Sequence, residues 1–295
     1  MSPDLGSVRT ADGRDLETLI EGADDGLLLV FHHGSPGAVA PFEGLDVAAR
    51  ELGIRVVSYS RPGYGGSSRH EGRSVADCAP DVAAIADHLG VERFVTAGWS
   101  GGGPHALATA ALLPDRTLAV STIAGVAPWD ADGLDWTAGM GKDNQIEYTT
   151  AARDPEELLR WMQPQIEAMR DITPAEIVSA MRSLISGVDE QAVNDALGEL
   201  LAAEFRSAFR EGPWGWYDDD LAYTRPWGFE LDAVGVPVAI WQGAQDLMVP
   251  FAHGEWLAAH LPTAEPRLRP EHGHLSLAVG SLGEILEDLV ALAGR

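Results

Sequence analysis

The stretch Gly98-Trp99-Ser100-Gly101-Gly102 decides how this chain is interpreted. It directly follows the apolar run 94–97 and precedes a helical pattern over 102–113, so a buried strand is expected to turn sharply into a helix at Ser100. A turn that forces a serine into strained backbone geometry crowds its neighbours, which is why the positions two before and two after it must lack side chains. These five residues therefore predict a nucleophile elbow, from which the hydroxyl of Ser100 projects at the N-terminus of the helix.

Short apolar runs alternate with helical patterns on both sides of this elbow. A strand that is covered by helices on both faces is apolar along its whole length, and strands that alternate with helices predict a mostly parallel sheet. The expected strands are 27–31, 55–59, 94–97, 118–123, 236–241 and 265–269, and the expected helices are 44–52, 75–89, 102–113, 251–261 and 282–289. An antiparallel hairpin is expected over 7–20, because Asp12-Gly13 tolerates the positive φ of a tight turn.

The alternation breaks over 129–228, where helical spacing replaces buried strand runs. Asp154 and Thr173 each precede Pro and, three residues on, Glu, which predicts two capped helices, and Asp189 could open a third. We expect this segment to be a helical lid inserted into one α/β core formed by 1–128 and 229–295. Its tryptophans could line an apolar pocket or only pack against the core: Trp129, Trp136, Trp161, Trp214, Trp216 and Trp227.

The composition excludes several classes of partner. The 295 residues include 20 Lys+Arg and 45 Asp+Glu, a formal net charge of -25 that repels phosphate backbones and anionic lipid surfaces. We therefore expect neither nucleic acid nor a membrane as partner. The N-terminus has no signal-peptide pattern and no apolar run approaches the about 18 residues of a membrane span, so a cytoplasmic protein is expected. Cys78 is the single cysteine, which excludes an intrachain disulfide and a cysteine-based zinc site. The sequence does not predict the oligomeric state.

A serine nucleophile needs a base and an acid, which in this architecture follow later strands of the core. Asp246 lies just after the strand run 236–241, and His274 lies between the next strand and the last helix. The order Ser100, Asp246, His274 therefore predicts a catalytic triad. Two alternatives stay open: His272 could replace His274 as the base, and Asp130 could replace Asp246 as the acid.

The tetrahedral intermediate of acyl transfer needs two backbone N–H groups as an oxyanion hole. Gly101, directly after the nucleophile, would supply one of them. Ser35 is the candidate for the other, because it lies in the small-residue loop His33-Gly34-Ser35-Pro36-Gly37 after the strand 27–31, although an ordinary turn could have the same sequence. The remaining candidates for a catalytic base are expected to be structural: His32, His33, His105 and His253.

Taken together, these motifs resemble the α/β-hydrolase superfamily. The resemblance rests on the loop 33–37, the loop Arg61-Pro62-Gly63-Tyr64-Gly65-Gly66-Ser67, the elbow, Asp246 and Gly273-His274. It implies an eight-stranded, mainly parallel sheet with a lid between strands six and seven, and a Ser-His-Asp triad. The loop 61–67 is also similar to that of epoxide hydrolases and haloalkane dehalogenases. Those enzymes attack with Asp, and an alkylated serine would not be hydrolysed, so Ser100 argues against both chemistries.

We expect a serine hydrolase that cleaves small or medium acyl esters of small molecules through an acyl-enzyme, with no metal and no cofactor. A lactonase, a carbon-carbon bond hydrolase and a perhydrolase would share the same triad and remain alternatives. Proline iminopeptidases share a loop similar to 33–37, but the elbow departs from theirs. From a different class, a ligand-binding protein that keeps the fold without turnover is also possible.

Overall fold

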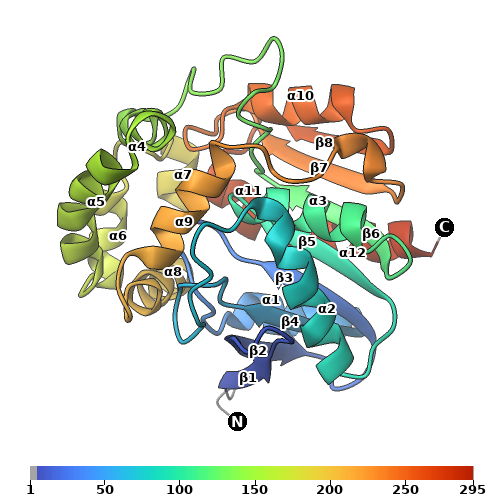
Figure 1. Cartoon of the computed structure of the whole chain (residues 1–295). Helices are drawn as coiled ribbons and strands as arrows, with labels where there is room; N and C mark the ends of the chain where they lie inside the picture. The colour runs from blue at the N-terminus through green and yellow to red at the C-terminus, as the bar shows by residue number, and fades with distance from the viewer. Residues whose placement is uncertain (1–4, 295) are drawn as a thin grey trace.

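Eight strands form a single sheet within residues 5–294, the part of the chain that this computed structural model describes (Figure 1). The strands are β1 (Leu5–Arg9), β2 (Asp15–Gly22), β3 (Leu27–His32), β4 (Ile54–Tyr59), β5 (Phe94–Trp99), β6 (Thr117–Ile123), β7 (Val238–Gly243) and β8 (Ala264–Arg269). Their order across the sheet is β1-β2-β4-β3-β5-β6-β7-β8. The first two strands pair antiparallel, β2 pairs antiparallel with β4, and every later pairing is parallel. The predicted fold class, a mostly parallel eight-stranded sheet flanked by helices, is therefore confirmed.

Helices cover both faces of the sheet, as the uniformly apolar strands predict. The flanking helices are α1 (Glu43–Glu51), α2 (Cys78–His88), α3 (Gly102–Leu112), α10 (Phe251–His260), α11 (His274–Gly280) and α12 (Leu282–Ala293). In β3, Leu29 packs in one cluster with residues of α1 and α12, whereas its neighbours Leu28 and Val30 pack with residues of α2. Since successive side chains of a strand point to opposite faces, α1 and α12 cover one face and α2 covers the other.

The segment between β6 and β7 holds a group of helices that lies beside the sheet (Figure 1). They are α4 (Lys142–Arg153), α5 (Pro155–Met169), α6 (Ile177–Ala180), α7 (Gly187–Ala192), α8 (Asp195–Ala208) and α9 (Trp214–Tyr223). Two apolar clusters join α4, α5, α6, α8 and α9, and each cluster also includes a core residue, Tyr64 in one and Leu275 in the other. The inserted helices are therefore packed onto the core rather than connected to it only by the chain.

The helix boundaries in this insertion differ in part from the sequence-based expectation. Asp154 caps α5 as predicted, accepting hydrogen bonds from the N–H groups of Glu156 and Glu157. The Thr173 capping box also forms, but it opens only the 3-10 turn Pro174–Glu176 and the four-residue α6. The expectation that Asp189 could open the third helix is wrong, because Asp189 lies inside the short α7. Asn194 caps α8 instead, because the Asp189 carboxylate is buried against the start of a different helix.

The last predicted helix, 282–289, lies within α12, and the separate helix α11 precedes it, with Ser281 between the two. Two further 3-10 turns, Val75–Asp77 and Leu231–Ala233, complete the regular structure of residues 5–294. In that part of the chain, no helix combines the length and the apolar character that crossing a lipid bilayer requires.

Candidate active site

The turn from β5 to α3 holds Ser100 in a strained backbone conformation. Its φ is 55°, in the left-handed region that residues other than glycine rarely adopt. A side chain at Gly98 would overlap the carbonyl of Gly102, and one at Gly102 would overlap the carbonyl of His32. The N–H of Ser100 donates to the carbonyl of Ile123 on β6 at 2.8 Å, which anchors the turn to the sheet. The glycines therefore have the steric role that the sequence pattern predicts.

His274, the first residue of α11, lies beside Asp246, which follows β7. Its Nδ1 is 2.8 Å from Oδ2 of Asp246, and both side chains are buried. Asp246 is held in turn by the N–H groups of Met248 and Val249, each 2.8 Å from Oδ1, and by the Gln242 amide at 3.1 Å from Oδ2. Asp246 occupies Nδ1 of His274. The other ring nitrogen, Nε2, is therefore available to a group in the cavity that both His274 and Ser100 line.

The two alternatives from the sequence lie elsewhere. The His272 side chain is partly exposed, with Nε2 3.9 Å from the Glu271 carboxylate. Asp130 is exposed and lines a different surface depression, together with Trp227 and Trp256. Neither residue lines the cavity that holds Ser100. The geometry therefore pairs His274 with Asp246.

Asp189 anchors the backbone of His274 from the inserted segment. This buried carboxylate accepts the N–H groups of His274 at 3.0 Å, Leu275 at 3.0 Å and Ser276 at 2.9 Å, the first turn of α11. It thus satisfies three donors that an isolated helix would leave unpaired, and its negative charge stabilises the positive end of the helix dipole. Sequence reasoning missed this role, because Asp189 and His274 are 85 positions apart in the chain and no local pattern links them.

We expect Asp189→Ala to lower the free energy of unfolding by about 2 kcal/mol, since three buried N–H groups lose a charged acceptor. Urea denaturation measures this change. Glu190→Ala is the matched control, because Glu190 is the exposed neighbour of Asp189 on α7 and should change stability by less than about 0.5 kcal/mol. Equal effects of the two substitutions would contradict the assigned anchor.

Two backbone N–H groups beside Ser100 are free to bind a ligand. Within residues 5–294, the N–H groups of Ser35 and Gly101 donate no hydrogen bond to the protein. Ser35 lines the cavity with Ser100, and Gly34 lies so close that a side chain there would contact the Ser100 Cβ. Unpaired donors at such a position are the component that an oxyanion hole requires.

Arg61 orients the peptide that carries the Ser35 N–H. Its guanidinium donates to the carbonyl of His33 and to that of Gly34, the latter at 2.9 Å. The Gly34 carbonyl also accepts from Nδ1 of His33 at 2.6 Å, since Nε2 of that ring is occupied by the N–H of Arg61. In a trans peptide, the carbonyl and the next N–H point in opposite directions. Fixing the Gly34 carbonyl therefore fixes the direction of the Ser35 N–H.

Asp219 of α9 completes this buried network. It pairs with Arg61 and Arg73, each at 2.7 Å, and accepts hydrogen bonds from the hydroxyls of Ser35 and Tyr64, each at 3.0 Å. Burial by itself would raise the pKa of Asp219, but the two guanidinium groups hold it well below its usual range. Sequence reasoning missed Asp219, although three successive acids within the apolar pattern of 214–223 were a signal that at least one is buried and paired.

The four histidines that were expected to be structural, His32, His33, His105 and His253, are buried and have structural contacts. Burial lowers the pKa of His32 to about 3 and that of His253 to about 4, and it holds those of His33 and His105 well below the usual range. These rings are therefore neutral at pH 7. Nδ1 of His105, for example, is 2.9 Å from the carbonyl of Gly101, which also accepts from the hydroxyl of Tyr223 at 2.9 Å. Their expected structural role agrees with these contacts.

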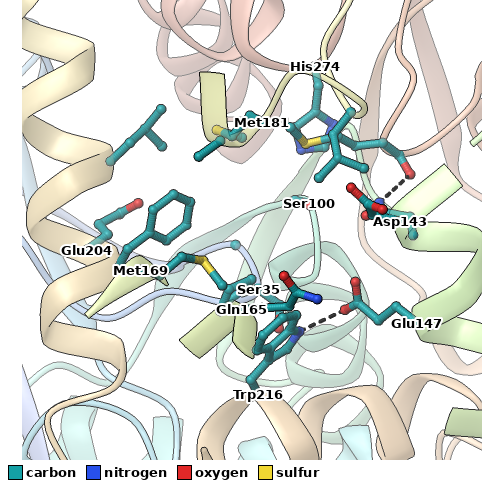
Figure 2. Close-up of a pocket in the computed structure, with 18 of the residues that line it drawn as sticks. Ser35, Ser100, Asp143, Glu147, Gln165, Met169, Met181, Glu204, Trp216 and His274 are labelled. Atoms are coloured by element: carbon teal, nitrogen blue, oxygen red, sulfur yellow. Dashed lines mark hydrogen bonds between the residues drawn. The ribbon is translucent and has the colours of Figure 1, made fainter. Parts of the chain in front are cut away.

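Ser100 and His274 open into a cavity of about 240 Å³ between the core and the inserted helices (Figure 2). Gly34, Ser35 and Pro36 line the core side, and α4, α5, α6, α8 and α9 supply most of the opposite wall. Of the six tryptophans in the insertion, Trp161 and Trp216 line this cavity. A smaller cavity of about 80 Å³ adjoins it and shares Trp99, Glu204 and Leu275 with it. The size of the main cavity suits a small molecule.

Comparisons with known proteins agree with this architecture. The family model described as alpha/beta hydrolase fold matches residues 28–281. The "Uncharacterized hydrolase YcgS" of Bacillus subtilis is 26% identical over 269 residues, 90% of each chain. A "Pimeloyl-[acyl-carrier protein] methyl ester esterase" of Nitrosomonas europaea is 26% identical over 86% of this chain and 91% of its own length. The solved structure of an alpha/beta hydrolase fold protein from Nakamurella multipartita superimposes with a TM-score of 0.64 at 25% identity, covering 99% of this chain and all of the other. The chain therefore belongs to the α/β-hydrolase fold family.

Proposed function

We propose that the protein is a serine hydrolase that cleaves small or medium acyl esters, with Ser100 as nucleophile, His274 as base and Asp246 as the acid that orients it. The observation that carries this proposal is the pairing of the buried His274 and Asp246 at 2.8 Å, beside a cavity that His274 lines together with the strained Ser100. The esterase name of the Nitrosomonas relative supports the ester as substrate class. We also propose that 129–228 acts as a lid over the core formed by 1–128 and 229–295.

In the proposed mechanism, the Ser100 hydroxyl attacks the ester carbonyl while Nε2 of His274 takes its proton. The N–H groups of Ser35 and Gly101 stabilise the negative oxygen of the tetrahedral intermediate. The intermediate then breaks its bond to the alcohol, which leaves with the proton from His274. Water, deprotonated by the same nitrogen, attacks the acyl-enzyme and releases the acid.

The pH dependence of this mechanism follows from the charges around His274. Burial alone would lower its pKa, but the charge of Asp246 and its hydrogen bond, together with the charge of Asp189, raise the pKa above its ordinary value of 6.5. The base must be neutral, so kcat/KM is expected to fall as the pH drops through a midpoint above 6.5. Asp189→Asn should move this midpoint downward, because it removes one of the nearby negative charges. A pH profile of kcat/KM with an ester of constant charge measures both effects, and a midpoint that does not move would contradict the assigned contribution of Asp189.

The test of the proposed function is the intact mass after treatment with an alkyl fluorophosphonate, which phosphonylates only an activated serine. We expect a single adduct on the unaltered protein and none on Ser100→Ala. Ser179→Ala, on the exposed surface of α6, is the matched control and should keep the adduct. A folded protein that forms no adduct would overturn the hydrolase proposal and favour the ligand-binding alternative. After a positive result, a panel of esters, lactones and diketones separates the esterase from the other chemistries of the same triad.

A further inference from the structure

Acidic side chains line the cavity at Ser100. Asp143 and Glu147 on α4 and Glu204 on α8 line it, and Figure 2 shows Glu204 on the opposite side of Ser100 from the other two. Among the described residues that line the cavity, there is no lysine or arginine. A cleft lined by one sign of charge, with low-dielectric walls, concentrates ligands of the opposite sign and repels those of the same sign.

Glu204 is the acid whose partner is missing. It forms no hydrogen bond or ion pair with any residue of the described range 5–294, whereas the Glu147 carboxylate accepts from the indole N–H of Trp216 at 2.7 Å. Glu204 also lines both the main and the smaller cavity, so this residue lies where they meet. A carboxyl group inside the protein without a partner is unfavourable, and a ligand that supplies the partner would remove that cost.

The aromatic lining of the main cavity points to the same kind of ligand. Trp161 and Phe205 belong to the same wall as Glu204, and Trp99, Tyr148 and Trp216 complete the aromatic lining. The face of an aromatic ring attracts cations, and ammonium groups in particular are bound by aromatic side chains in combination with acids. An apolar, aromatic wall with an unpartnered acid therefore favours a compact organic cation over an anion or a metal ion.

We propose that the substrate is an ester that carries an ammonium group, and that Glu204 is the specificity-determining residue that binds this group. The inference rests on the proposed function and adds the substrate class to it. The ammonium could belong to the alcohol part, as in a choline ester, or to the acyl part, as in an ω-amino acid ester. Both have the same charge chemistry, and the experiment distinguishes them.

The other charged groups near Glu204 define how its ionisation can be observed. Burial raises its pKa to about 8, and Arg61 acts in the opposite direction. Burial also raises the pKa of Glu147 to about 7. Asp143 and Tyr148 lie on the same helix as Glu147, and His274 lies across the cavity. Glu21 and His33 line the smaller cavity, and the lining residues of α5 and α6 are uncharged.

The ratio of two kcat/KM values isolates Glu204 from the catalytic machinery. Choline butyrate is compared with its uncharged isostere 3,3-dimethylbutyl butyrate, and methyl 6-aminohexanoate with methyl heptanoate, by titrating the released acid between pH 6 and 9. Both members of a pair need the same state of His274, so its titration cancels in the ratio. For at least one pair, we expect the charged ester to be preferred about tenfold or more at pH 9, because Glu204 is then ionised. The preference should decline as the pH falls through about 8.

Two variants assign the preference to its residue. Glu204→Gln should reduce it to within about threefold of unity, since the amide keeps the size of the side chain but has no charge. Glu199→Gln is the matched control, because Glu199 is exposed on the same helix and lines neither cavity. Ratios at or below one for both pairs at every pH, or an unchanged preference in Glu204→Gln, would overturn the proposal.

A binding measurement keeps the test decisive if Glu204→Gln does not fold or if no ester is cleaved. Calorimetry of choline and, separately, of methyl 6-aminohexanoate with Ser100→Ala at pH 7, in two buffers of different ionisation enthalpy, should detect binding of at least one of them with release of a proton from Glu204. Absence of binding, or binding without proton release, would overturn the ammonium site. Hydrolysis of the neutral esters without preference for the charged ones would leave the esterase proposal intact and refute this inference alone. Absence of both hydrolysis and a fluorophosphonate adduct would refute the esterase instead.

Discussion

Replacing His274 with alanine is expected to lower kcat for a simple ester by about 10⁶-fold, because Ser100 then has no base to take its proton. Asp246→Asn should lower kcat by about 10⁴-fold, since the amide no longer holds the imidazole in the tautomer that presents a free Nε2 to Ser100. Both variants should remain folded. Their residual rates can be measured with end-point assays of the released product, at micromolar enzyme concentrations so that slow turnover is detectable.

The two residues that the sequence left open as alternatives provide the controls for this prediction. His272→Ala and Asp130→Asn are each expected to change kcat by less than about threefold, because neither side chain lines the cavity of Ser100. A loss in His272→Ala comparable to that in His274→Ala would refute the assigned base. A comparable loss in Asp130→Asn would refute the assigned acid.

Replacing Arg61 with methionine is expected to lower the free energy of unfolding by about 4 kcal/mol, because the buried Asp219 loses one of its two guanidinium partners and keeps only Arg73. The same substitution removes the guanidinium donors from the carbonyls of His33 and Gly34 and leaves the Gly34 carbonyl only its contact with His33, so the direction of the Ser35 N–H is fixed less firmly. We therefore expect kcat of the folded variant to fall by about 10²-fold, the typical effect of losing one oxyanion donor.

Chemical denaturation and steady-state kinetics below the transition measure the two effects separately. Arg153→Met is the matched control, because Arg153 forms an exposed ion pair with Glu157 at 2.6 Å on the inserted helices. Breaking that pair should cost no more than about 0.5 kcal/mol and leave kcat unchanged. A loss of less than about 1 kcal/mol in Arg61→Met, with kcat unchanged, would contradict the positioning role.

Local sequence patterns predicted those parts of the molecule that depend on neighbouring residues. The elbow at Ser100 follows from glycine at positions 98 and 102, because sterics within a few residues decide a tight turn. The central strands follow from their uniform apolarity, and the cap of α5 follows from Asp154. The order of Ser100, Asp246 and His274 along the chain was sufficient to select them as candidates, because parallel strands bring their carboxyl ends to one edge of the sheet.

The groups that hold and complete this site depend on contacts between distant segments, which no local pattern contains. Asp189 was expected to open a helix in its own segment, but tertiary packing places its carboxylate at the start of α11. Asp219 meets Arg61 across 158 residues, and Glu204 reaches the cavity only because α8 packs over the core. A buried charge is stable only with a partner, and the partner is selected by the folded arrangement rather than by proximity in sequence. The sequence by itself thus determined the core fold and the candidate catalytic groups. The tertiary structure decided which residues surround these groups, hold their orientation and set the charges around them.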